Sequence, residues 1–264
     1  MIGQEIGKVL ECGIRSKDCR TCMYWSAKYI DPPEHECFMN FTGSSTAMEA
    51  DVAAELVQRI EERGEVQIGT LIMDDDCSTI ARVRKELGHE VNKWSDIMHT
   101  KKHLKSSLYK LQCKHLSLSS DVISYLVDKC FSYALAQNKG NPSGLQKALS
   151  AIVPHVFGEH QSCGTWCKHQ AGEIMVYRYL PNGRCLVGDQ FRQDLARIFE
   201  DLAEKSDKIA PCGSTSACES VNNMIRAKAK EANHFSASGN LSARVDCVVS
   251  QTRIRGFKAW LKWQ

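Results

Sequence analysis

The chain has 264 residues, of which 43% are hydrophobic and 25% charged, so it can bury a core of ordinary size and is no short peptide scaffold. No stretch approaches the roughly eighteen consecutive apolar residues of a membrane helix, so we expect no membrane partner. The formal net charge of +3 permits a nucleic-acid partner without arguing for one.

Cysteine use points to metal rather than to disulfides. The chain has 13 cysteines, an odd number that cannot all pair within it. Its first residues lack a basic region followed by an apolar stretch, so we expect no secretory signal and a reducing compartment. In such a compartment, clustered cysteines more often bind metal than form disulfides.

The predicted elements alternate between strand and helix at first and become mainly helical later. The strands rest on alternating or short β-branched apolar runs, and the helices on apolar residues three and four apart with capping residues before them. In chain order we expect a strand over 8–14 that completes a hairpin, a helix from 44 or 45 to 63, a buried strand over 66–73, mainly helices from 94 to about 207 (including 121–137 and 190–205), and a helix over 216–230.

Three consecutive aspartates, Asp74, Asp75 and Asp76, follow the predicted buried strand where it reaches the sheet edge. Like charges repel, so something must offset them. One interpretation is a solvated turn that caps the next helix at Ser78. The other is a divalent cation held by carboxylate oxygens, with Glu219 as a further ligand from the start of a later helix. Taken alone, Glu219 is also explained by the helix dipole.

Two Cys/His clusters have the ligand types and spacings of tetrahedral zinc sites. The clusters are Cys19, Cys22, His35 and Cys37, and, further along the chain, His155, His160, Cys163 and Cys167. Cys12 is a competing ligand for the first cluster, and the short span of the second requires a tight knuckle. Burial of the thiols in the core, without metal, is the alternative in both cases.

A predicted helix that begins near Asp96 carries His99 and His103 four residues apart. A histidine pair without a Glu partner is usually a polar helix face rather than a zinc site. The same helix carries basic residues that suit phosphate groups, which require positive charge rather than one fixed geometry. These basic residues are Lys101, Lys102 and Lys105. In the later helix, Asn222 shares a face with Glu219.

The order of these motifs resembles the transposase domain of Mutator-like DNA transposons, and the resemblance covers nearly the whole chain. The motifs are Cys19-x2-Cys22, His35-x-Cys37-x2-Asn40-x2-Gly43-Ser-Ser45-x2-Met48-Glu49, Asp74-Asp-Asp76, Asp96-x2-His99-x2-Lys102, His155-x4-His160-x2-Cys163-x2-Trp166-Cys167 and Glu219-Ser-x-Asn222.

The resemblance implies an α/β fold: a ribonuclease-H-like mixed sheet, incomplete because its opening strands are missing, with a large, mainly helical insertion. Residues 1–93 would form the first part of this core with its Cys/His loop, 94–207 the insertion with the second Cys/His cluster, and 208–264 the part with the Glu helix and a basic tail. The implied partner is DNA and the implied location the nucleus, while a homo-oligomer is left open.

The resemblance also implies an Asp-Asp-Glu triad that holds two Mg²⁺ or Mn²⁺ ions for phosphodiester cleavage and strand transfer. Asp74 or Asp76 would be the second acid and Glu219 the third, with Asp75 a bystander. The Lys101–Lys105 group and Asn222 would contact DNA, and Zn²⁺ would be structural.

The sequence departs from the family at its start. The family's first catalytic Asp lies on the opening strand, and this chain is expected to begin after that strand, so no residue takes that role. We therefore expect this chain alone neither to cut nor to join DNA. The alternatives are a domesticated, non-catalytic zinc-stapled module that binds DNA or protein, and an unrelated metal-dependent hydrolase built on the aspartates.

Overall fold

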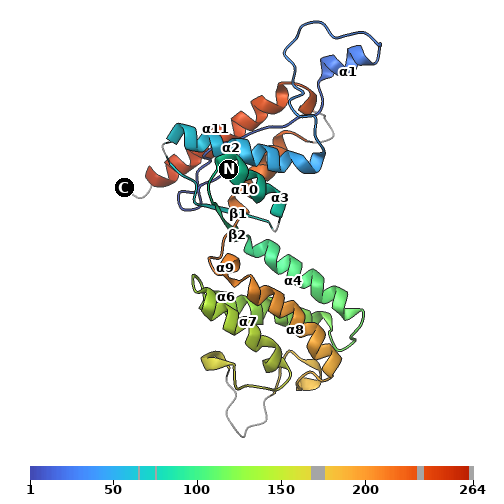
Figure 1. The fold of residues 1–264 in the computed structure, drawn as a ribbon, viewed down its shortest axis with the longest axis vertical. Coiled ribbons are helices and arrows are strands. Elements are labelled where there is room, and N and C mark those ends of the chain that lie inside the picture. The colour runs from blue at the N-terminus through green and yellow to red at the C-terminus, as the bar shows by residue number, and fades with distance from the viewer. Residues whose placement is uncertain (65, 75, 168–175, 231–234, 262–264) are drawn as a thin grey trace. The chain divides into compact units, whose positions relative to one another are not determined.

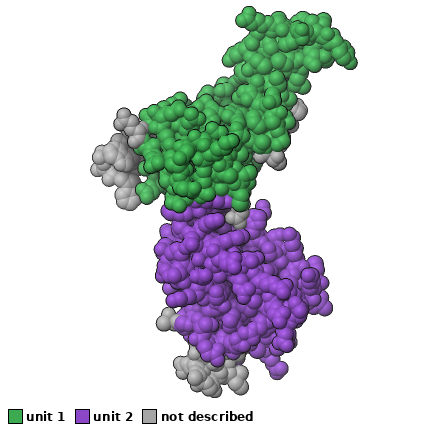
Figure 2. All heavy atoms as spheres, in the orientation of Figure 1, with its two compact units in different colours: residues 1–71, 75–92, 215–264 green, residues 72–74, 93–214 purple. Residues whose placement is uncertain are grey.

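The computed structural model describes residues 1–264 apart from 65, 75, 168–175, 231–234 and 262–264. The chain forms two compact units (Figure 2). Unit 1 consists of Met1–Leu71, Asp75–Asn92 and Thr215–Gln264, and unit 2 of Ile72–Asp74 and Lys93–Ser214. The interpretation of 94–207 as an insertion into a catalytic core stays a prediction.

The described chain is mostly helical, with one small sheet (Figure 1). Its longer elements are α1 (Arg20–Ser26), α2 (Ser45–Gly64), β1 (Thr70–Met73), α3 (Cys77–Leu87), β2 (Asn92–Ser95), α4 (Ile97–Gln112), α5 (Ser120–Ser124), the π-helix η1 (Tyr125–Phe131), α6 (Ser132–Gln137), α7 (Pro142–Val156), α8 (Asp189–Glu204), α9 (Ser206–Ile209), α10 (Ser216–Lys228) and α11 (Asn240–Leu261). Among the described residues, none of the helices has the length and apolar run needed to cross a bilayer.

Strands β1 and β2 are parallel neighbours joined by helix α3, which is a strand–helix–strand motif. The Asn92 N–H donates to the Gly69 carbonyl at 2.8 Å and the Asp96 N–H to the Met73 carbonyl at 3.2 Å, so both partners advance in the same direction. Helix α3 ends at Gly88, whose φ of +69° is the left-handed conformation that glycine adopts without strain.

The strand predicted over 66–73 is present only in its second half. The Ile68 N–H donates to the Glu61 carboxylate at 2.7 Å, so a side chain of α2 takes the place of a neighbouring strand. Strand β1 begins after this bond, at Thr70. The apolar pattern of residues 66–73 contains no information about the Glu61 side chain.

The prediction of a strand over 8–14 was wrong. Val9 forms an isolated antiparallel bridge with Ile2, and the Gly3 N–H donates to the Lys8 carbonyl at 3.0 Å. The hairpin is therefore made within the first ten residues, and its turn contains Gly7 at φ +61°. Residues 10–16 have no regular structure.

Helices and the amino-terminal hairpin together build the core of unit 1. Helix α2 packs against α3, with Val57 and Val83 fully buried. Arg15 forms ion pairs with Asp51 and Glu55 of α2, which ties the segment after the hairpin to that helix. A second cluster joins the hairpin to helix α11 through Val9, Val245 and Val249.

Unit 2 is a helical bundle around one continuous core that includes Leu108, Phe131, Leu149 and Leu195. The helix predicted over 121–137 is present as three consecutive segments, α5, η1 and α6. The middle segment is a π-helix, and the Ser132 hydroxyl donates to the carbonyl five residues earlier, that of Val127, at 2.9 Å. The spacing of apolar residues in the sequence does not distinguish this π-helical turn from an α-helical one.

Candidate metal centres

The first Cys/His cluster is assembled in unit 1. The ligand atoms of Cys19, Cys22, His35 and Cys37 all lie within 4.8 Å of one another. His35 Nε2 is 3.4 Å from the Cys19 sulfur and 3.3 Å from that of Cys22, and the Cys22 and Cys37 sulfurs are 3.6 Å apart. Ligand atoms around a tetrahedral Zn²⁺ lie roughly 3.6–3.8 Å apart, given its bond lengths of about 2.0 and 2.3 Å. The cluster therefore has the size of a zinc site.

Local hydrogen bonds prepare these side chains for a cation. The backbone N–H of Cys22, followed by that of Phe38, lowers the pKa of Cys19 to about 6, which favours the thiolate that zinc binds. The hydrogen bond with the Cys37 thiol, followed by burial, raises the pKa of Cys22 to about 11, so that a thiolate at Cys22 needs a cation beside it. His35 Nδ1 is 2.8 Å from the Pro33 carbonyl, and donation there leaves the Nε2 lone pair directed at the thiols.

Asn40 closes the base of this Cys/His loop. Its side-chain oxygen accepts from the Ser16 N–H at 2.7 Å, and its amide nitrogen donates to the Ile14 carbonyl at 3.0 Å. The Phe41 N–H also donates to Ser16, at 3.1 Å. Asn40 belongs to the motif by which the chain resembles its family, but sequence reasoning assigned it no role. An asparagine next to a Cys/His loop is the sequence feature that could have indicated this role, because asparagine side chains readily form hydrogen bonds with nearby backbone groups.

Helix α1, which carries Cys22, depends on this loop. It has only seven residues and none of them is buried. Isolated helices shorter than about 12 residues are marginal in water, so α1 needs another source of stability. A metal held by Cys19 and Cys22 at its start would supply one.

The second Cys/His cluster is assembled in unit 2 and is more deeply buried. Its ligand atoms, from His155, His160, Cys163 and Cys167, also lie within 4.8 Å of one another. His155 Nδ1 lies 3.4 and 3.6 Å from the sulfurs of Cys163 and Cys167, and His160 Nδ1 lies 3.7 and 3.4 Å from the same atoms. Both histidines thus present Nδ1 to both thiols. The tight knuckle expected from the short span is made by the end of α7 and by Gly158 and Gly164, at φ +92° and +68°.

Tyr177 orients the second cluster. Its hydroxyl donates to the His155 carbonyl at 3.1 Å and lies 2.9 Å from His160 Nε2, from which it accepts. A proton on Nε2 leaves the Nδ1 lone pair of His160 facing the thiols. No local spacing marks Tyr177, which is ten residues beyond the last ligand, so sequence reasoning missed it.

Aromatic packing and burial shape the electrostatics of the second cluster. The Trp166 ring lies 4.5 Å from the ring of His155, centroid to centroid. Burial, and then the Cys167 thiol, raise the pKa of Cys163 to about 12. A thiolate at this position therefore requires a cation beside it, and a bound metal provides that charge.

The predicted catalytic carboxylates are distributed over the two units. Asp74 belongs to unit 2 and forms an ion pair with His99. Asp76 and Glu219 belong to unit 1, and neither is part of a group of three or more metal-ligating side chains among the described residues. Asp75 lies outside the described residues. The convergence of Asp74 or Asp76 with Glu219 stays a prediction.

Asp76 has a structural task that the sequence analysis offered as one interpretation. Its carboxylate caps α3 and accepts from the backbone N–H groups of Ser78 and Thr79 at 2.9 and 3.0 Å. The Thr79 hydroxyl and then the Ser78 N–H hold the pKa of Asp76 well below its usual range. Glu219 lies in the first turn of α10, where the helix dipole favours a carboxylate.

The residues predicted to contact DNA are accessible. Lys102 and Asn222 are exposed, Lys101 and Lys105 are half-buried, and the opposite face of α4 buries Leu104 and Leu108. None of the three lysines forms an ion pair within the part of the chain that the structure describes. A DNA contact through these side chains stays a prediction.

Fold and sites define a mostly helical protein with a small parallel sheet and two Cys/His tetrads able to hold a metal such as zinc. The profile of the Mutator-like transposase family matches residues 1–167, and the chain belongs to that family. The match includes every residue of both tetrads and ends at Cys167, while Tyr177, Glu219 and Asn222 lie beyond it. No curated protein matches the chain. No solved structure matches it either.

Proposed function

We propose that this chain is part of the catalytic domain of a Mutator-like transposase, with a ribonuclease-H-like core, and that it acts on DNA in the nucleus. The observation that carries the proposal is the family match over residues 1–167, since membership in a transposase family implies binding to DNA. The parallel β1–α3–β2 motif supports the proposal, because strands joined in this way are building blocks of α/β sheets. In this proposal the helical bundle of unit 2 is the insertion.

Both tetrads serve as structural zinc sites in this proposal. Each offers four protein ligands, two or three of them thiols, and a site with four protein ligands leaves no position for a substrate. Zinc would hold the α1 loop in unit 1 and fix the end of α7 in unit 2.

Asp74 is the better candidate for the second catalytic acid, because the carboxylate of Asp76 is engaged by the cap of α3. His99, through its ion pair, holds Asp74 in place. Glu219 remains the candidate for the third acid. Two bound Mg²⁺ or Mn²⁺ ions would supply activation of a water or 3′ hydroxyl and stabilisation of the leaving oxygen. With only two of the three acids assigned, we expect residues 1–264 by themselves not to cut DNA.

One observation favours the non-catalytic alternative, a zinc-stapled module that binds DNA or protein. Both aspartates proposed for the second acid have partners of their own, His99 for Asp74 and the start of α3 for Asp76. A module of this kind would keep the zinc sites and the basic face of α4, and would need no carboxylate cluster.

The test of the proposal measures DNA binding and cleavage with the zinc-loaded full chain. We expect salt-dependent binding of duplex DNA, with a log–log salt slope that falls by about two to three when all three α4 lysines are changed to Gln. Absence of binding at low salt would overturn the DNA-directed function. A Mg²⁺- or Mn²⁺-dependent cleavage product that Glu219→Gln abolishes would show a complete active site and exclude the non-catalytic module.

A further inference from the structure

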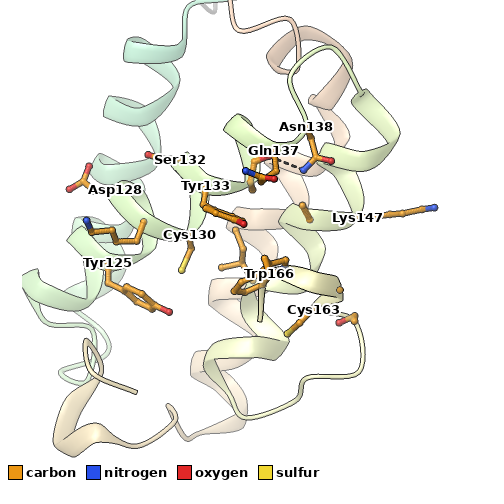
Figure 3. A pocket seen from close by; sticks show the side chains of 16 residues that line it. Tyr125, Asp128, Cys130, Ser132, Tyr133, Gln137, Asn138, Lys147, Cys163 and Trp166 are labelled. Atoms are coloured by element: carbon orange, nitrogen blue, oxygen red, sulfur yellow. Dashed lines mark hydrogen bonds between the residues drawn. The ribbon is translucent and has the colours of Figure 1, made fainter. Parts of the chain in front are cut away.

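A cavity of 780 Å³ lies in unit 2 beside the second Cys/His tetrad (Figure 3). Its base is apolar and includes Ala134, Ile152 and Cys163, which are all buried. The π-helix η1 lines one side, and such wide turns occur frequently at functional sites. The volume is typical of a pocket for a small organic group.

Two aromatic rings face this cavity from different elements. Tyr133 reaches it from α6 and Trp166 from the knuckle of the tetrad (Figure 3). Their centroids are 6.5 Å apart and their planes are inclined at 49°. A planar ring inserted between two others needs them to be parallel and about 7 Å apart, which is twice the roughly 3.5 Å contact distance between carbon atoms. At this distance and inclination the two rings contact each other directly, so a flat heterocycle fits between them only after the Tyr133 ring has moved outward.

The two rings differ in mobility. Trp166 packs on the buried His155, so its position is set by the tetrad. Tyr133 is 46% exposed, and its hydroxyl has no hydrogen bond to any described residue, so its ring can turn parallel to an incoming group. One fixed ring and one adjustable ring suit a ligand that enters from solvent.

Polar groups at the edge of the cavity indicate which heterocycle fits. Gln137 lies one helical turn after Tyr133, and its amide has no hydrogen bond within the described chain. Asn138 uses its amide nitrogen on the Ala134 carbonyl at 2.8 Å, which fixes the direction of its oxygen. Lys129 and Lys147 border the cavity and are exposed. Aromatic rings, the Gln137 amide and nearby exposed cations are the kinds of group that proteins use for a base and its phosphates.

We infer that this cavity receives a single unstacked base of DNA, stacked between Trp166 and Tyr133 and contacted at its edge by Gln137. The inference rests on the proposed DNA-directed function and adds a base-binding site to it. The second tetrad then has a further role, because the metal it holds would fix the Trp166 side of the base site.

The experiment compares two DNA duplexes bound by the zinc-loaded full chain. One duplex is fully paired, and the other has the same sequence with one extra, unpaired 2-aminopurine. Stacking on an aromatic side chain is sequence-tolerant and strong, so we expect the bulged duplex to bind about tenfold more tightly and its fluorescence to be quenched. Tyr133→Ala should remove the tenfold ratio and the quenching, while Tyr133→Phe, which keeps the ring, should retain both.

Tyr109→Ala is the matched control, since Tyr109 is another partly exposed helical tyrosine of unit 2 and does not line the cavity. It should leave the affinity ratio unchanged. Equal binding of both duplexes by the native chain, with normal salt dependence, would overturn the base site and leave the proposed function intact. A tenfold ratio that persists in Tyr133→Ala would also overturn it. Failure to bind either duplex would overturn both proposals.

Discussion

Removal of one hydroxyl group, in Tyr177→Phe, tests how the second tetrad is held together. The substitution keeps the ring, which is stacked beside that of His160 with centroids 6.1 Å apart, and removes only the oxygen. The His160 Nε2–H then loses an acceptor at 2.9 Å in a site where Tyr177 itself is 6% exposed. The His155 carbonyl retains the Gly158 N–H at 3.1 Å, so the loss falls mainly on His160.

Two independent estimates give the size of the effect. Loss of a typical side-chain hydrogen bond costs about 0.5–1.5 kcal/mol. Loss of the group that accepts a hydrogen bond from a metal-binding histidine lowers metal affinity by about 10–100-fold, which corresponds to roughly 1.4–2.7 kcal/mol. We therefore expect Tyr177→Phe to weaken metal binding at the second tetrad by about 10–100-fold and to leave the first tetrad unchanged.

Cobalt substitution can separate the two sites. Co²⁺ bound by three thiolates and one imidazole absorbs differently from Co²⁺ bound by two of each, so a chelator titration reports the affinity of each tetrad. Tyr179→Phe is the control, because the Tyr179 hydroxyl has no hydrogen bond to the described residues. An unchanged affinity of the second tetrad in Tyr177→Phe, or an equal loss in Tyr179→Phe, would show that the Tyr177 hydroxyl does not orient His160 for the metal.

Two further predictions concern unit 1. Asn40→Ala removes two hydrogen bonds at the base of the first Cys/His loop. Each bond contributes about 1 kcal/mol, so the free energy that protects residues 17–39 against hydrogen exchange should fall by about 2 kcal/mol. Asn40→Asp keeps the acceptor for the Ser16 N–H and should lose about half of this. Asp76→Ala removes the cap of α3 and should lower the free energy of unfolding in urea by about 1 kcal/mol, whereas Asp76→Asn should lose only a few tenths. Since the pKa of Asp76 is lowered in the folded state, the advantage of its carboxylate should be complete at neutral pH and decline below about pH 4. No change with pH, or identical losses in Asn40→Ala and Asn40→Asp, would count against these assignments.

The parts of the fold that sequence reasoning predicted depend on neighbours in the chain. Asp96 and Ser119 cap helices where capping residues were expected, and both tetrads assembled because their ligands lie within short loops. Their spacing alone limits how far apart the ligands can be. For this reason the assembly of the two Cys/His tetrads could be predicted before the fold was known.

The missed features depend on contacts made across the chain. Glu61 takes the Ile68 N–H and shortens β1, and Tyr177 reaches back to His160 over 17 residues. Apolar periodicity carries no information about either partner. The catalytic carboxylates are the extreme case, since the gap between Asp76 and Glu219 is far longer than any local rule can bridge.

Metal analysis of the purified full chain decides whether both Cys/His tetrads hold zinc. Two zinc ions per chain are predicted, falling to one in Cys22→Ser and to one in Cys163→Ser, with the remaining ion in the other tetrad. A chain that is folded by circular dichroism and urea titration yet carries no zinc, or one that keeps two ions in both variants, would show that the tetrads are not zinc sites.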